Sequence, residues 1–184
     1  GPFMLQLPPG FGPAELPLLA RFLRELPRDL PYAVELRHPA FFSGGPAEVD
    51  LDNLLRGEAV DRVIFDSRGL WDSDKADPQV KAAQGRKPRL PVRLTTTARS
   101  PLVRFVAHAR LDANRWLLRA WADQRALWIE QGLEPFVFVH APDETHAPEL
   151  ARRLHEHLSR RIDAGQLPPW PSETEPPVRQ LGLF

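Results

Sequence analysis

Ionisable side chains recur in short segments that have the composition of β-strands. Glu35, Asp66 and His140 lie at or near the carboxyl ends of such segments, and Arg37 and Arg104 accompany them. Two carboxylates and an imidazole could share general acid–base catalysis, or bind a divalent metal ion. Both guanidinium groups could hold a phosphate or carboxylate. The pattern predicts three catalytic and two anion-binding residues, with the metal unknown.

These side chains can meet only if they face the same side of their strands. Side chains alternate across a strand, so apolar residues of one parity, such as Val34, Val63 and Val103, are expected to pack against outer helices. The opposite parity contains Gln6, Glu35, Arg37, Asp66, Arg104 and His140. Each strand is therefore predicted to offer an inward polar group, with several near the carboxyl ends, where barrel enzymes place their sites.

A purely structural interpretation accounts for the same residues. Glu35 would pair with Arg104, and Asp66 would cap backbone amides in the turn at residues 66–68. Buried charges need partners whether or not they perform chemistry. A ligand site and a paired internal network therefore remain open at this point.

The elements that carry these residues alternate between strand and helix. Strands are predicted at residues 3–7, 32–36, 62–66, 103–107 and 136–140. Helices are predicted from about Pro13 to Pro27, from Pro46 to Gly57, from an Asp112 cap to Gly132, and from Pro148 to Ala164. Leu117, Trp121 and Trp128 share one face of the third of these helices and are expected in the core. The alternation indicates an α/β fold with a parallel sheet, either open or part of a barrel.

Several motifs carry a family resemblance. They occur at residues 5–9 (LQLPP), 32–39 (YAVELRHP), 65–68 (FDSR), 86–92 (RKPRLPV), 101–105 (PLVRF), 141–143 (APD) and 147–150 (APEL). In order and spacing the chain resembles the YecE-like family, a domain-of-unknown-function family. The resemblance implies a TIM-like (β/α) barrel with about five of eight βα units in this chain, because members carry roughly three earlier strands. It implies architecture and little about mechanism.

Composition excludes several classes of protein. The 184 residues contain 24 basic and 24 acidic side chains, so no global field attracts nucleic acid or an anionic membrane. Cysteine is absent, which excludes disulfides and thiolate metal sites and is consistent with a cytoplasmic location. No apolar run is long enough to span a bilayer. We therefore expect a cytoplasmic protein that does not enter membranes.

One stretch is locally basic. No acidic residue lies between Asp77 and Asp112, whereas eight Lys and Arg residues do. They are Lys81, Arg86, Lys87, Arg89, Arg93, Arg99, Arg104 and Arg110. The stretch could contact a phosphate backbone. Alternatively, it is a solvated loop whose cations pair with acids elsewhere, such as Asp72 and Asp74.

The end of the chain differs in composition from the rest. Residues 1–164 form the predicted barrel domain, residues 165–179 a proline-rich linker and residues 180–184 (QLGLF) a short motif. The motif resembles the peptide by which proteins bind the bacterial sliding clamp. That resemblance implies that Gln180, Leu181, Leu183 and Phe184 contact the clamp, although Gly182 departs from the usual small polar or acidic residue. Alternatively, Leu183 and Phe184 fold back onto the barrel.

Two functional hypotheses follow. The first is a hydrolase, such as a phosphoesterase linked to nucleic-acid metabolism, that uses the predicted catalytic and anion-binding residues. The second is a non-catalytic adaptor that binds the sliding clamp through its C-terminal peptide. A phosphate-containing ligand or nucleic acid is the expected partner of the barrel.

Overall fold

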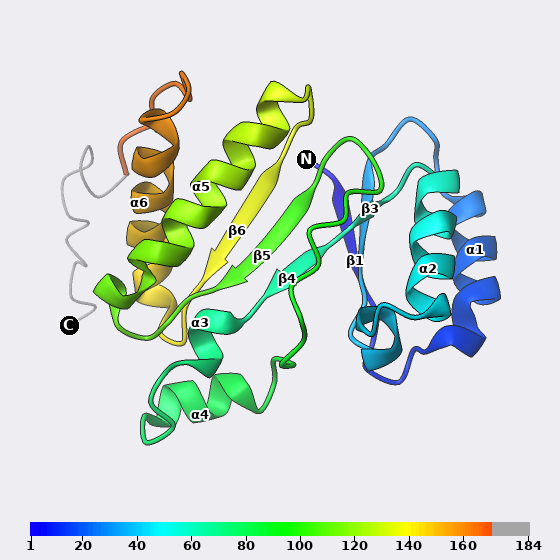
Figure 1. Ribbon diagram of the computed structural model, residues 1–184, viewed down its shortest axis with the longest axis horizontal. Helices are drawn as coiled ribbons and strands as arrows, with labels where there is room; N and C mark the ends of the chain where they lie inside the picture. The colour runs from blue at the N-terminus through cyan, green and yellow to red at the C-terminus, as the bar shows by residue number, and fades with distance from the viewer. Residues whose placement is uncertain (171–184) are drawn as a thin grey trace, which may run out of the picture.

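The computed structural model describes residues 1–170 and shows strands alternating with helices (Figure 1). The strands are β1 (Phe3–Gln6), β2 (Tyr32–Glu35), β3 (Asp61–Arg62), β4 (Ile64–Asp66), β5 (Leu102–Val106) and β6 (Phe136–His140). The α-helices are α1 (Leu16–Glu25), α2 (Pro46–Gly57), α3 (Arg68–Trp71), α4 (Pro78–Gln84), α5 (Arg115–Glu130) and α6 (Ala147–Ser159). All five predicted strands are found, and the α/β class is confirmed.

The third predicted strand is divided in two. β3 pairs with β2, and β4 pairs with β5, so two three-stranded parallel sheets meet at Val63. The Val63 amide still donates to the Val34 carbonyl oxygen at 2.9 Å, which links the two sheets into one curved layer. The order β1-β2-β3 continues as β4-β5-β6, with each strand beside its neighbour in the chain.

The layer curls strongly. Arg104 on β5 donates a hydrogen bond of 3.0 Å to Gln6 on β1, although β2 and the β3–β4 segment lie between those strands in the sheet. Three strand spacings in a flat sheet would be about 14 Å. Curvature therefore brings the inward side chains of distant strands together. Among residues 1–170, however, the strands do not close into a barrel.

Helices cover the outer face of the curved layer in two groups (Figure 1). α1 and α2 pack on β1 and β2 around a core that includes Leu19, Leu51 and Phe41. α5 and α6 pack on β4, β5 and β6. In that second core Leu117, Trp121 and Trp128 are buried, as their helical spacing predicted.

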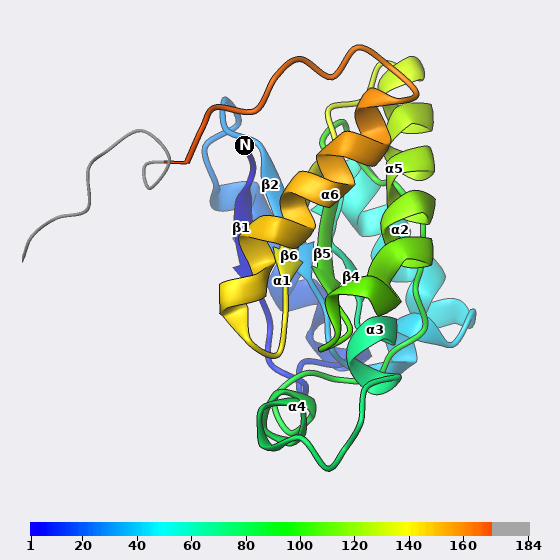
Figure 2. The same ribbon diagram turned by 90° about the vertical axis from the view of Figure 1, so that its left-hand side faces the viewer.

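Helix boundaries differ in detail from those expected. Asp112 does not cap the long helix: a 3₁₀ turn at Leu111–Asn114 comes first, and α5 has Asn114 at its N-cap. α6 ends at Ser159, before the predicted Ala164. The segment after α6 turns back along it, with His155 hydrogen-bonded to the Gly165 carbonyl oxygen (Figure 2).

Two short helices were not expected from the sequence. α3 and α4 follow β4 and lie beyond the carboxyl ends of the strands (Figure 1). Asp77 caps α4 by accepting from the Gln79 amide at 2.8 Å. Among the described residues, no helix is long and apolar enough to cross a membrane.

Candidate functional site

Four of the five predicted barrel-site residues meet on the inner face of the sheet. The fully buried Glu35 carboxylate accepts from Arg37 Nε at 2.8 Å and from Arg104 Nη1 at 2.6 Å. Both guanidinium groups also donate to Gln6 Oε1, each at 3.0 Å. Arg104 Nη2 lies 3.4 Å from His140 Nε2. One hydrogen-bonded group therefore spans β1, β2, β5 and β6.

Asp66 lies on the opposite face. Its Oδ2 accepts from the indole of Trp121 on α5 at 2.8 Å and from Arg68 Nη2 at 2.8 Å. Its Oδ1 accepts from Arg68 Nε and from the Arg68 amide, at 2.9 and 3.0 Å. Asp66 thus holds the turn after β4 and the face of α5, as the structural interpretation expected, and does not reach Glu35 or His140.

The reason is a reversed parity in this one strand. Val63 packs with Ala33 and Leu102 on the inner face, whereas Ile64 joins the outer core under α5. In the other strands the outward residues are the ones expected, such as Val34 and Val103. Polar residues occur only at the two ends of this predicted strand, Arg62 and Asp66, so the apolar residues between them give no alternation from which the facing could be read.

Phe65 therefore replaces Asp66 on the inner face. The guanidinium carbon of Arg37 lies 5.9 Å from the centre of the Phe65 ring, and that of Arg104 lies 5.8 Å from it. Cations over an aromatic face are attracted by its quadrupole. The ring gives the two arginines a common support, which sequence reasoning assigned to the outer core.

Two further residues join the cluster from loops. His140 Nδ1 lies 3.4 Å from Glu144 Oε1, and the same carboxylate oxygen is 4.0 Å from Lys87 Nζ. Arg104 can only donate, so the contact at His140 Nε2 requires an acceptor there, and Nδ1 carries the proton toward Glu144. Glu144 was not predicted, and Lys87 was predicted only as one of the eight cations of the basic stretch.

The electrostatics of the cluster are those of a cation-rich site. Burial lowers the pKa of His140, and Lys87 and Arg104 lower it further, while Glu144 opposes them. Burial also lowers the pKa of Lys87; Glu144 opposes this shift, whereas Arg104, Arg86 and Arg37 add to it. His140 is therefore neutral near pH 7, and Lys87 holds its proton less firmly than an exposed lysine.

Two further cations of the basic stretch are paired with acids. Arg93 binds Glu48 at 2.9 Å, and Arg99 lies 3.4 Å from Glu134. These partners are glutamates from other elements, not Asp72 or Asp74. Among the described residues, Lys81, Arg86, Arg89 and Arg110 form no salt bridge, so pairing with acids accounts for only part of the stretch.

No metal centre is formed by the predicted residues. Across residues 1–170 there is no group of three or more His, Asp or Glu side chains placed to hold a metal ion. The predicted clamp-binding residues, Gln180, Leu181, Leu183 and Phe184, lie outside the described residues.

Comparison with known proteins gives consistent matches. The family model described as "Protein of unknown function DUF72" matches residues 1–175. The UPF0759 protein YecE of Escherichia coli K12 is 39% identical over 175 residues, which is 95% of this chain and 64% of that protein. The YecE protein of Escherichia coli O157:H7 matches to the same extent. The chain thus spans 64% of the length of these relatives, which is slightly less than two thirds.

Solved structures share the fold. A crystal structure of a DUF72 family protein from Enterococcus faecalis V583 matches with a TM-score of 0.63 and 16% identity, covering 86% of this chain and 61% of that one. A DUF72 family protein from Thermotoga maritima matches with a TM-score of 0.57 and 17% identity, covering 85% and 56%. At these identities the likeness concerns the fold.

Proposed function

We propose that this chain, which belongs to the DUF72 family of proteins of unknown function, binds a phosphate-bearing ligand on the inner face of its curved sheet. The observation that carries the proposal is a surplus of positive charge. Arg37 and Arg104 share the buried Glu35 carboxylate. Lys87, whose pKa is lowered by burial and further by both nearby arginines, has among the described residues only the exposed Glu144 as an acid partner, at 4.0 Å. A ligand anion would supply the missing negative charge.

The geometry suits an added anion. The side chains of Arg37 and Arg104 are 14% and 12% exposed, so neither is sealed completely from solvent. Glu144, the other nearby acid, is 60% exposed and 4.0 Å from Lys87, and a ligand phosphate could replace it there. Charge-assisted bonds from guanidinium to phosphate are among the strongest hydrogen bonds in proteins.

Hydrolysis of a phosphoester would use His140 as the acid–base group. Its neutral ring, oriented by Glu144, could accept a proton from an attacking water at Nε2 once the ligand draws Arg104 away. Glu35 would position the two arginines. Asp66 is left out of this role because both of its oxygens already accept hydrogen bonds from Arg68 or Trp121.

The same inner face supports the larger architecture that the family resemblance implies. Ala33, Val63, Leu102 and Phe136 form one apolar layer contributed by β2, the segment between β3 and β4, β5 and β6. Layers of inward side chains from successive parallel strands are typical of TIM-like barrels. We infer that this chain forms an arc of such a barrel, with the cation-rich cluster at its carboxyl end.

Titration with inorganic phosphate, followed by NMR or calorimetry, tests the binding proposal. Lys87→Gln should weaken phosphate binding about tenfold, because it removes one cation without leaving a buried acid unpaired. Lys81→Gln, on the exposed face of α4, is the matched control and should bind as the wild type does. Equal affinity in both variants would contradict the proposal.

A phosphomonoesterase assay on the same proteins tests catalysis separately. His140→Gln should abolish turnover of a chromogenic phosphate ester while phosphate still binds. Binding without any turnover in the wild type would retain the ligand site and remove the hydrolase.

A second candidate function is that of a sliding-clamp adaptor. The family model ends its match at residue 175, so Gln180–Phe184 lies beyond the conserved domain model and carries its own motif. Micromolar binding of the whole chain to a purified bacterial clamp should disappear in the Leu183→Ala, Phe184→Ala double variant. Binding that survives the double change, or no binding at all, would rule the adaptor out.

A further inference from the structure

A cavity lies apart from the cation-rich cluster and shares no residue with it. This cavity, of about 320 Å³, opens between α3 and the start of α5. Its walls include Arg68, Trp71, Arg89, His108 and Trp116. Arg68 and Trp71 follow β4, and His108 and Trp116 follow β5, so most of the cavity lies at the carboxyl ends of the strands. Arg89 comes from the connection that precedes β5. A volume of this size is at the lower end for small-molecule sites.

Two tryptophan–arginine pairs border the cavity. The Arg68 guanidinium carbon lies 5.4 Å from the centre of the Trp116 ring, and that of Arg89 lies 5.9 Å from the Trp71 ring. Trp116 is 56% exposed at the first turn of α5, an unusual place for so large an apolar side chain. An exposed indole beside a hollow offers a flat surface to a second ring.

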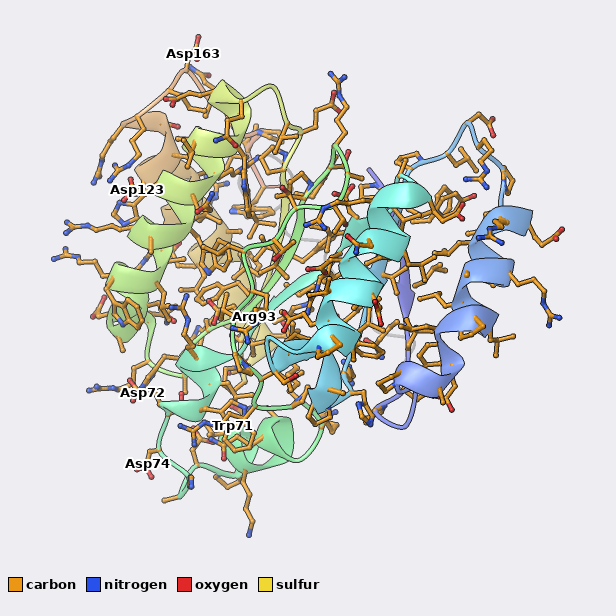
Figure 3. The ribbon with its side chains drawn as sticks, turned by 45° about the vertical axis from the view of Figure 1, so that its right-hand side comes forward. Trp71, Asp72, Asp74, Arg93, Asp123 and Asp163 are labelled. Atoms are coloured by element: carbon orange, nitrogen blue, oxygen red, sulfur yellow. The ribbon has the colours of Figure 1, made fainter. Side chains whose placement is uncertain are left out.

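The other tryptophan is held in place by the backbone. The Trp71 indole donates to the Pro88 carbonyl oxygen at 3.4 Å, and Ser67 Oγ donates to the same oxygen at 2.9 Å. Trp71 points toward the interior beside α4, whereas Asp72 points outward (Figure 3). Arg89 follows Pro88 directly, and its guanidinium group faces the Trp71 ring.

The floor of the cavity is rigid. A Cβ atom at Gly69 would come within 2.5 Å of the His108 amide nitrogen, so only glycine lets α3 approach β5 this closely. The buried Asn114 side chain accepts from the same amide at 2.7 Å and donates to the His108 carbonyl oxygen at 3.0 Å. A site framed by fixed backbone is organised before its ligand arrives.

His108 adds a hydrogen-bond donor, and the tautomer of its ring follows from one contact. Its Nδ1 accepts from the Arg110 amide at 2.9 Å, which places the ring proton on Nε2. The cavity therefore combines flat aromatic surfaces, an imidazole N–H, and guanidinium groups at its border. The aromatic surfaces suit stacking against a ring, the imidazole N–H suits a heteroatom of that ring, and the guanidinium groups suit an anion.

We propose that this cavity binds a planar heterocycle carrying an anionic group, of the class of a nucleoside monophosphate. The ring stacks on Trp116 and Trp71, and the anion contacts Arg89. Arg68 is less available because two of its nitrogens already bind Asp66.

Adenosine monophosphate, adenosine and inorganic phosphate are the probes, titrated separately with tryptophan fluorescence and calorimetry as readouts. The monophosphate should bind more tightly than adenosine, and both should quench fluorescence, whereas inorganic phosphate should not. Trp116→Ala should weaken both ring-containing probes about tenfold or more. Arg89→Gln should weaken the monophosphate alone.

Matched variants separate this site from the cation-rich cluster. Trp170→Ala removes another exposed tryptophan that faces an arginine, Arg152, away from the cavity, and should leave affinity unchanged. Lys87→Gln should leave the binding of adenosine unchanged, so failure of the phosphate site would not affect this result. The proposal is overturned if adenosine does not bind at millimolar concentration, or if Trp116→Ala binds it as the wild type does.

Discussion

Two arginine networks lie on opposite faces of the same sheet, and they differ in charge balance. On the outer face Arg62, whose side chain is 1% exposed, donates to Asp52 at 2.7 Å and to Glu48 at 3.2 Å, and it also binds the Phe41 carbonyl oxygen. Arg93, beside α2 in Figure 3, binds Glu48 as well. Two cations face two carboxylates, and the network is closed.

The network on the inner face has more cations than buried carboxylates. Arg37 and Arg104 share one buried carboxylate, that of Glu35, whereas Lys87 has, among the described residues, only the exposed Glu144 at 4.0 Å. Burial tends to raise the pKa of Glu48, but the Gly44 amide, Arg62 and Arg93 outweigh it and hold that pKa below its usual range. The comparison teaches that an arginine on a strand is structural where its charge is matched, and available for a ligand where it is not.

The largest effect is expected from breaking the closed network. Arg62→Met leaves Glu48 and Asp52 without their shared cation, and should lower the free energy of unfolding by about 3–5 kcal/mol. Urea denaturation at pH 7 measures the loss. A loss below about 1 kcal/mol would show that the outer network does not depend on matched charge.

Asp61 sharpens the comparison, because it is a buried carboxylate with no cation beside it. Burial raises its pKa to about 6, against the hydrogen bonds from the Ser100 and Ala98 amides, and its Oδ1 has no hydrogen-bond partner among the described residues. The folded-state pKa thus lies above the unfolded value of 3.8. The contribution of Asp61 to the free energy of unfolding is then greatest below about pH 4. It falls by roughly 3 kcal/mol as the pH rises through 6.

Asp61→Asn should remove that pH dependence. Between pH 4 and pH 7 the wild type should lose stability that the variant keeps, so the free energy of unfolding of the variant should rise relative to that of the wild type. Urea denaturation at each pH measures both values. Asp29→Asn, an exposed acid, is the control. Parallel curves for wild type and Asp61→Asn would contradict the raised pKa.

A smaller effect tests the surplus charge of the inner network. Lys87→Gln removes a cation that lowers the pKa of His140, so that pKa should rise by a fraction of a unit. NMR titration of the His140 ring protons measures the shift. If the pKa stays where it is, or falls, Lys87 does not contribute to the field at the site.

The smallest effect is expected at the surface. Arg99 and Glu134 lie 3.4 Å apart and are 75% and 62% exposed, so solvent screens them. Arg99→Gln should change the free energy of unfolding by less than about 0.5 kcal/mol in the same urea assay. A loss approaching that of Arg62→Met would remove the distinction between matched buried pairs and surface pairs.

Much of the fold could be predicted from the sequence. The five strands, the α/β class and the family resemblance rest on local composition and on motifs, and each is confirmed. Glu35, Arg37, Arg104 and His140 were also predicted to share a face, because they have the parity opposite to that of Val34, Val103 and Val137, and the structure brings them together.

Other features depended on the tertiary structure. α3 and α4 are too short for a periodic signal and form because Asp77 caps one and Gly69 lets the other pack against β5. The reach of Arg104 to Gln6 depends on curvature, which no local pattern specifies.

The sequence by itself determined which segments form strands and helices, because side-chain period and hydrophobicity are local properties. Only the tertiary structure decided that Phe65, not Asp66, faces the arginines, since a strand that is buried on both faces has no polar alternation to orient it. It also decided which carboxylate meets which cation. Ion pairing depends on distances across the sheet, and these are set by the strand order and by the curvature at Val63.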